Sequence, residues 1–250
     1  MGQPKSLNEK RLTKKQVQQI IATEGRLHEE YTACFKEIYP SGYTVQHLVY
    51  ELPNDRFLFV FDPKESSIGG KGDIFTKDYI IRSIKWQQRV KDDYANNRGS
   101  SVDHWRFYSK HKNDLINQVD TLIEELAKIL NIDKKKLDKS YKSLDIVSEC
   151  TEQYGIDKAI IDIYDNLVAY IGEVLRLQVK GGWKINADFA GGSYPYIDVG
   201  LKRIQYMPIN VVWDSLHGLE IVDFRKASGN EARQVGAKAS FERGEYGQKT

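Results

Sequence analysis

A long apolar run that ends near a pair of glycines constrains the fold of this chain more than any other segment. Residues 160–177 are rich in isoleucine, leucine, valine and tyrosine, and Gly181-Gly182-Trp183 follows shortly after. Apolar residues that recur every three or four positions predict one face of a packed helix. Paired glycines favour a tight turn, because glycine adopts backbone conformations that other residues avoid. The segment therefore predicts a buried helix that turns sharply into a strand.

The same run argues against a membrane span. Asp162, Asp165 and Glu173 interrupt it, and charged side chains are costly inside a lipid bilayer. The N-terminal residues up to Lys15 are polar and basic, so we expect no secretory signal. A chain with two cysteines that lie far apart is typical of a reducing compartment. We therefore expect a cytoplasmic protein without a membrane partner.

Composition allows a sizeable core and indicates no particular partner. The chain has 250 residues, 40% of them hydrophobic, and a formal net charge of +2. Such a balance does not require an anionic partner. Asp138 interrupts the densest basic segment, Lys134–Lys142, so we interpret that segment as a solvated loop. Nucleic-acid binding through it is kept as a third functional hypothesis, and the oligomeric state stays open.

The order of helical and β-rich segments predicts an α+β fold. We expect a helix-rich N-terminal half with one β-hairpin, formed by the runs 43–52 and 57–61 on either side of a Pro-Asn-Asp turn. In the C-terminal half, two helices should pack on a small antiparallel sheet. The expected organisation is a helical region with the hairpin over 12–132, an α+β domain over 133–227 and a weakly ordered polar tail over 228–250.

Aromatic side chains gather in the second half and predict a surface for a protein partner. Alternation along 194–199 places two tyrosines on one face of a strand, and Pro195 favours an edge strand, where a partner could add. Aromatic rings provide large contact area at low entropic cost. The predicted partner-binding residues are Trp183, Tyr194, Tyr196, Tyr206 and Trp213.

The sequence predicts no catalytic residue, no metal site and no cofactor. On one helix, His104 and His111 would lie roughly 10 Å apart, too far to share an ion. Glu173 falls off the apolar face, so we expect either a surface pair with Arg176 or hydrogen bonds from the backbone amides of the glycine turn. The residues that we assign a structural role are Tyr170, Gly172, Glu173, Gly181 and Gly182.

Several of these short segments together resemble a known group of domains. They are Leu137–Leu144, Tyr170–Glu173, Gly182-Trp183 and Pro208–Val211. Over about residues 131–219 the chain resembles bacterial domains of unknown function, which are similar to some encoded near toxin and immunity genes. The resemblance implies a bacterial, immunity-like protein and supplies no catalytic residues.

We therefore expect a non-catalytic, cytoplasmic protein-binding protein of bacterial type, which would neutralise a toxin by masking its active surface. The alternative is a hydrolase-like enzyme with a carboxylate site around Glu173 and Asp188, because burial of a carboxyl against tryptophan would raise its pKa and make it a candidate acid.

Overall fold

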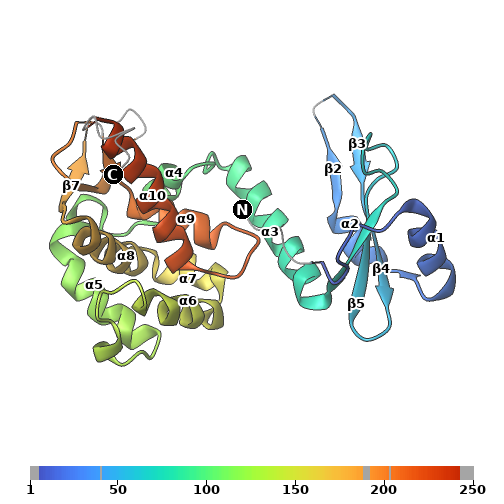
Figure 1. The fold of residues 1–250 in the computed structure, drawn as a ribbon, viewed down its shortest axis with the longest axis horizontal. Helices are drawn as coiled ribbons and strands as arrows, with labels where there is room; N and C mark the ends of the chain where they lie inside the picture. The colour runs from blue at the N-terminus through green and yellow to red at the C-terminus, as the bar shows by residue number, and fades with distance from the viewer. Residues whose placement is uncertain (1–5, 40, 188–191, 203, 243–250) are drawn as a thin grey trace, which may run out of the picture. The chain divides into compact units, whose positions relative to one another are not determined.

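The chain divides into two compact units, Met1–Arg89 and Val90–Thr250, and each is described by itself (Figure 1). The computed structural model describes residues 6–39, 41–187, 192–202 and 204–242. Asp188, which belongs to the alternative enzyme site, and the end of the predicted tail, residues 243–250, lie outside these ranges.

The first unit is built on a four-stranded antiparallel sheet. Its strand order is β1 (Arg26–Leu27), β4 (Leu48–Leu52), β5 (Arg56–Val60) and β6 (Gly72–Thr76). The predicted hairpin is present as β4 and β5, with Leu52 paired to Arg56. Asn54 and Asp55 adopt left-handed backbone in its turn, with φ of 65° and 53°, which these residue types tolerate better than most.

Short elements cover the two faces of this sheet. They are α1 (Lys14–Thr23), α2 (Glu29–Cys34) and the separate two-stranded sheet of β2 (Lys36–Ile38) and β3 (Thr44–Gln46). Val17 of α1 packs with Leu58 on one face, and Phe35 packs with Phe57 on the other. A new helix starts after His28, because its ring accepts a hydrogen bond from the backbone N–H of Tyr31.

The second unit is mostly helical and is organised around one buried helix. Residues Tyr164 to Leu175 of α8 are buried on every side, and α5, α9 and α10 all contact α8 (Figure 1). A small sheet of order β7, β8, β9 lies beside them. The elements are α3 (Lys77–Ala95), which crosses the boundary between the units, α4 (Ser101–Tyr108), η1 (Lys112–Asp114), α5 (Leu115–Ile129), η2 (Lys134–Lys136), α6 (Ser143–Tyr154), α7 (Ile156–Asp162), α8 (Tyr164–Val179), β7 (Gly182–Asn186), β8 (Tyr194–Asp198), β9 (Gln205–Tyr206), α9 (Pro208–Leu216) and α10 (Phe224–Glu242).

The predicted layout of the α+β fold is wrong in both halves. The first unit is a sheet structure with short helices, and the second has many more than two helices. The two compact units meet between Arg89 and Val90, and Ile132 and Leu137, which flank the predicted boundary near residue 132, belong to a single core. The predicted tail is helical as far as Glu242, and Val235 and Ala239 bury their small side chains against the sheet. Such a sparse apolar face gives a weak helical pattern in the sequence.

The segment 160–177 is helical, as predicted, but in two pieces, with α7 ending at Asp162 and α8 starting at Tyr164. Among the described residues, no helix combines the length and the apolar character needed to cross a lipid bilayer.

Candidate functional site

Two histidines and one aspartate from three separate helices converge in the second unit. Asp93 lies in the last turn of α3, His104 lies in α4, and His217 is the residue that caps the end of α9. Asp93 Oδ2 lies 3.1 Å from His104 Nε2 and 3.3 Å from His217 Nδ1. One ligand atom from each residue lies within 4.8 Å of the other two. We call these three residues the triad.

Local sequence and helix packing explain how two members of the triad meet. Ser100 caps α4 by accepting a hydrogen bond from the backbone N–H of Asp103. Pro208 suits the first turn of α9, because its missing N–H would have no partner there. The two helices pack together, and Ser101 Oγ donates to Asn210 Oδ1 at 2.6 Å.

Arg98 fixes the orientation of Asp93. Its Nε donates to Asp93 Oδ1 at 2.8 Å, and its Nη2 donates to Asp92. The guanidinium is itself buried, and it lies 4.4 Å from the centre of the Phe107 ring. With one oxygen of Asp93 held by Arg98, the other oxygen faces the two histidines. Such outer contacts orient metal-ligating carboxylates and increase metal affinity.

Burial keeps His104 in its neutral form. Removal from water lowers the pKa of His104 to about 4, against the opposing effect of Asp93. At neutral pH the ring therefore has a nitrogen lone pair. His104 Nε2 is buried, and within the part of the chain that the structure describes it makes no hydrogen bond of acceptable geometry, despite its closeness to Asp93. A neutral imidazole whose inward nitrogen has no hydrogen-bond partner has the chemistry of a metal ligand.

Trp213 forms one wall of the triad. Its ring stacks on His217 with centroids 3.9 Å apart and meets His104 edge to face at 4.0 Å. The stacking follows from helical spacing, because residues four apart lie on the same face of α9. The ring of Tyr108 lies 5.0 Å from that of His104. These aromatic groups limit the access of water to the histidines.

The donor set of the triad fits a first-row divalent ion. Ligand bonds of about 2.0–2.2 Å to nitrogen and carboxylate oxygen place neighbouring donors roughly 3.3 Å apart in a tetrahedral site, close to the two distances from Asp93 Oδ2. Two histidines with one carboxylate are found in catalytic zinc and non-haem iron sites. The charge of Arg98 opposes a cation, but its contact with Asp93 is on the oxygen remote from the histidines.

Glu173 is a buried structural carboxylate rather than a free acid. It is 5% exposed. Arg176 donates to it from Nε and Nη2 at 2.7 and 2.9 Å, and Trp183 Nε1 donates at 2.8 Å. Burial raises the pKa of Glu173, but the hydrogen bonds from Arg176 and Trp183 outweigh burial and hold the pKa below its usual value. The predicted pair of Glu173 with Arg176 is present, but Glu173 is buried and does not lie at the surface. The indole N–H of Trp183 donates to Glu173 in place of the backbone amides expected as donors in the alternative prediction.

The glycines around this carboxylate provide room for close packing. A Cβ atom on Gly172 would lie 2.0 Å from the Trp183 ring, and one on Gly181 would lie 2.5 Å from Ile197. The left-handed position at the end of α8 is taken by Lys180, with φ 54°. The tight turn therefore depends on Lys180, and the glycines at 172 and 181 allow side chains to approach the backbone.

Four of the five aromatic residues predicted to bind a partner belong to, or pack against, the cores of the second unit, and the fifth, Trp213, stacks on His217. Tyr194 and Tyr206 are each 6% exposed, and Tyr194 Oη donates to Gln205 and accepts from Asn186. Trp183, Tyr196 and Trp213 are partly buried. The edge-strand prediction is wrong, because β8 is the central strand. Pro195 is tolerated there since β9 pairs only with Ile197 and Asp198.

The basic segment is engaged with acidic side chains. Lys134 Nζ lies 2.5 Å from Glu124, and Lys139 Nζ lies 3.3 Å from Glu173 and 3.6 Å from Asp120. These pairs reduce the positive charge that the segment offers to a nucleic acid.

The triad was not predicted from the sequence. Helical spacing relates His104 only to His111, and the structure instead places His111 Nδ1 2.8 Å from Asp165 Oδ2. No local motif joins Asp93, His104 and His217, which are far apart in the chain. No protein-family model matches the chain, and the searches of curated proteins and of solved structures likewise found no match.

Proposed function

We propose that the second unit is a metal-binding module, which holds a zinc-class divalent ion between Asp93, His104 and His217. The observation that carries the proposal is the convergence of three donor atoms within 4.8 Å in a largely buried position. A buried histidine nitrogen without a hydrogen bond is costly unless another group satisfies it. Three protein ligands also leave a coordination position for water or a substrate, as in catalytic rather than closed structural zinc sites.

Zinc is expected to bind one ion per chain with a Kd of about 1 µM or tighter. At about 100 times the Kd it should stabilise the protein by about 2.7 kcal/mol and raise the Tm by about 5–10 °C. Isothermal titration calorimetry and thermal unfolding measure both effects. Cobalt(II) provides an independent probe, because imidazole and carboxylate ligands in a distorted site give visible absorption bands.

Two matched variants distinguish this site from a network of purely structural contacts. His104→Ala should weaken zinc binding by about 100-fold or more, whereas His111→Ala, which removes another histidine paired with an aspartate, should leave it unchanged. A structural network predicts instead that His104→Ala lowers stability equally with and without zinc. That result, or the absence of saturable binding in the unaltered chain, would refute the proposal.

A second candidate is the cytoplasmic, immunity-like protein binding expected from the sequence. It is favoured by exposed apolar side chains near the turn between β2 and β3 on the first unit. Ile38, Tyr39 and Tyr43 are 69%, 45% and 46% exposed, and the two tyrosine rings lie 6.0 Å apart. Exposed aromatic side chains of this kind are enriched at protein interfaces.

The partner to test is the purified product of the gene adjoining this one, in keeping with the implied toxin and immunity context. Tyr39→Ala and Tyr43→Ala should each weaken binding by about 10-fold, corresponding to about 1.4 kcal/mol. Ile221→Ala, at a position 70% exposed on the second unit, should not. Equal effects of all three variants, or no binding by calorimetry, would contradict this candidate function.

A further inference from the structure

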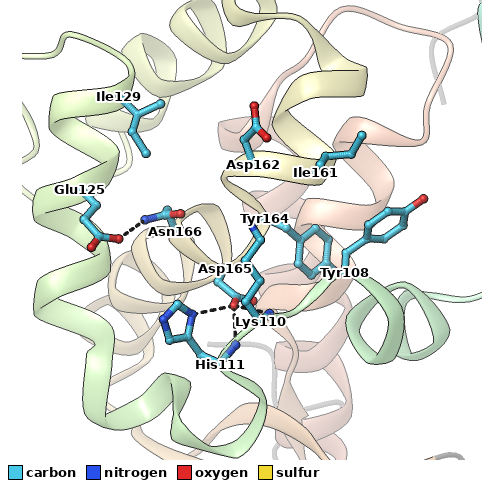
Figure 2. A pocket seen from close by; sticks show the side chains of 10 residues that line it. All are labelled: Tyr108, Lys110, His111, Glu125, Ile129, Ile161, Asp162, Tyr164, Asp165 and Asn166. Atoms are coloured by element: carbon cyan, nitrogen blue, oxygen red, sulfur yellow. Dashed lines mark hydrogen bonds and ion pairs between the residues drawn. The ribbon is translucent and has the colours of Figure 1, made fainter.

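A small cavity in the second unit lies between the segment after α4, the end of α5 and the junction of α7 with α8 (Figure 2). Its volume is about 120 Å³. It shares no lining residue with the triad, although the ring of Tyr108 lies 5.0 Å from that of His104 and 6.1 Å from that of Tyr164. Binding in this cavity can therefore be tested separately from metal binding.

Two polar side chains that line the cavity keep an atom without a hydrogen bond. Asp165 and Tyr164 are 4% and 2% exposed. Among the described residues, Asp165 Oδ1 and Tyr164 Oη have no hydrogen-bond partner. Buried polar atoms are nearly always satisfied in folded proteins, by protein, water or ligand. Both residues line the cavity, and the unsatisfied polar atom on each favours a hydrogen-bonding group bound there.

The other oxygen of Asp165 is fixed in place. Oδ2 accepts hydrogen bonds from the backbone N–H groups of Lys110 and His111 at 2.8 and 2.9 Å, and it lies 2.8 Å from His111 Nδ1 (Figure 2). Asp165 also stands in the first turn of α8, where the helix dipole favours negative charge. The carboxylate is consequently held in one orientation, and its other oxygen, Oδ1, is left buried without a hydrogen-bond partner among the described residues.

The charge of the lining favours a cationic donor. Glu125, Asp162 and Asp165 are acidic, against one lysine, Lys110. The aromatic rings of Tyr108 and Tyr164 also line the cavity, and such rings attract cations. A cavity of about 150 Å³ accommodates benzene, so this smaller one has room for about five heavy atoms.

From this geometry we propose that the cavity binds the ammonium group of a small primary amine, which donates hydrogen bonds to Asp165 Oδ1 and Tyr164 Oη. Tyr108, Ile129 and Ile161 line the same space and contact the short alkyl part. The cavity recognises a cation that has N–H donors and a short alkyl chain.

Titration of the intact protein with n-propylammonium, followed by NMR chemical shifts, tests the proposal. Saturable shifts at Asp165 and its neighbours are expected, with a Kd of about 1 mM or tighter, within the ligand efficiency reached by very small ligands. Tetramethylammonium has the same charge without N–H donors and should bind at least about 10-fold more weakly. Equal binding of the two cations, or no saturable shift because ordered water alone fills the cavity, would overturn the proposal.

Two conservative variants locate the binding. Asp165→Asn retains an acceptor for the backbone N–H groups but places an NH₂ group toward the ligand, so binding should weaken by at least about 10-fold. Tyr164→Phe removes only an atom that makes no hydrogen bond in the described structure, so the protein should fold normally and bind the amine several-fold more weakly. Asp145→Asn, at an exposed aspartate paired with Arg225, is the control. Unchanged affinity in Tyr164→Phe and Asp165→Asn would refute the assignment.

Discussion

Gly172→Ala is expected to destabilise the protein by about 3 kcal/mol, the upper range for overpacking a core. An added Cβ would lie 2.0 and 2.2 Å from two atoms of the Trp183 ring and 3.1 Å from Pro208. Trp183 cannot withdraw without losing its hydrogen bond to Glu173, which measures 2.8 Å. The strain must therefore appear as displacement of the ring, of α8 or of both. Urea unfolding at neutral pH measures the loss.

Gly182 provides the control for this prediction. Gly182→Ala should change the free energy of unfolding by no more than about 0.5 kcal/mol, because a Cβ there would meet nothing within 4 Å. When Trp183 is already replaced by alanine, adding Gly172→Ala should lower the free energy of unfolding only slightly further, because the clashing ring is absent. Equal losses in Gly172→Ala and Gly182→Ala would show that the effect comes from glycine backbone freedom and not from packing against Trp183.

Glu173→Gln is expected to destabilise the protein by about 1.5–3 kcal/mol at neutral pH, the range for hydrogen bonds to charged groups. The substitution preserves size but leaves Arg176 and Lys139 facing a neutral side chain. Because both cations are partly exposed, the loss should stay below that of a fully buried pair. Glu124→Gln breaks the exposed pair with Lys134 and should cost about 0–1 kcal/mol.

The stabilisation of the folded protein by the Glu173 carboxylate should decrease as the pH falls. The pKa of Glu173 is lowered in the folded state, so the unfolded chain binds more protons as the pH falls. The stabilisation is therefore fully present above the unfolded pKa of about 4.3 and declines as the pH falls toward the folded pKa. Unfolding free energies measured at pH 7 and pH 3 should show the gap between the unaltered chain and Glu173→Gln narrowing at pH 3. A gap independent of pH would mean that the carboxylate charge is not what stabilises this site.

Local patterns predicted individual elements better than their arrangement. The stripe of apolar residues in α5 is buried at Leu115, Val119, Leu122 and Leu126, and only Ile129 at its end is 42% exposed. The β4–β5 hairpin follows from two apolar runs around a turn. The prediction of a helix-rich N-terminal half with a single hairpin was wrong, because β1 and β2 also pair with strands further along the chain. Pairing of that kind depends on partners that a local window does not contain.

In the candidate sites, too, single residues could be predicted from the sequence, whereas their contacts with distant segments could not. Glu173 was singled out from the sequence, but its partners Lys139 and Trp183 come from other elements. The metal-binding triad was missed, since His104 and His217 meet only through the packing of α4 on α9. The cavity beside Asp165 was missed as well, because the chain after α4 must return to the start of α8 to place Lys110 and His111 there.

By itself, the sequence determined that residues 160–177 form a packed helical segment, which is followed, after glycines, by a strand with Trp183. The reason is that helical period and the lack of a side chain at glycine are properties of short segments. Only the tertiary structure decided that Gly172 makes room for Trp183 and that Glu173 is buried and ionised. It also decided that one ligand atom from each of Asp93, His104 and His217 lies within 4.8 Å of the other two. These outcomes depend on side chains brought together from distant segments, and a closely packed interior leaves few other positions for those side chains.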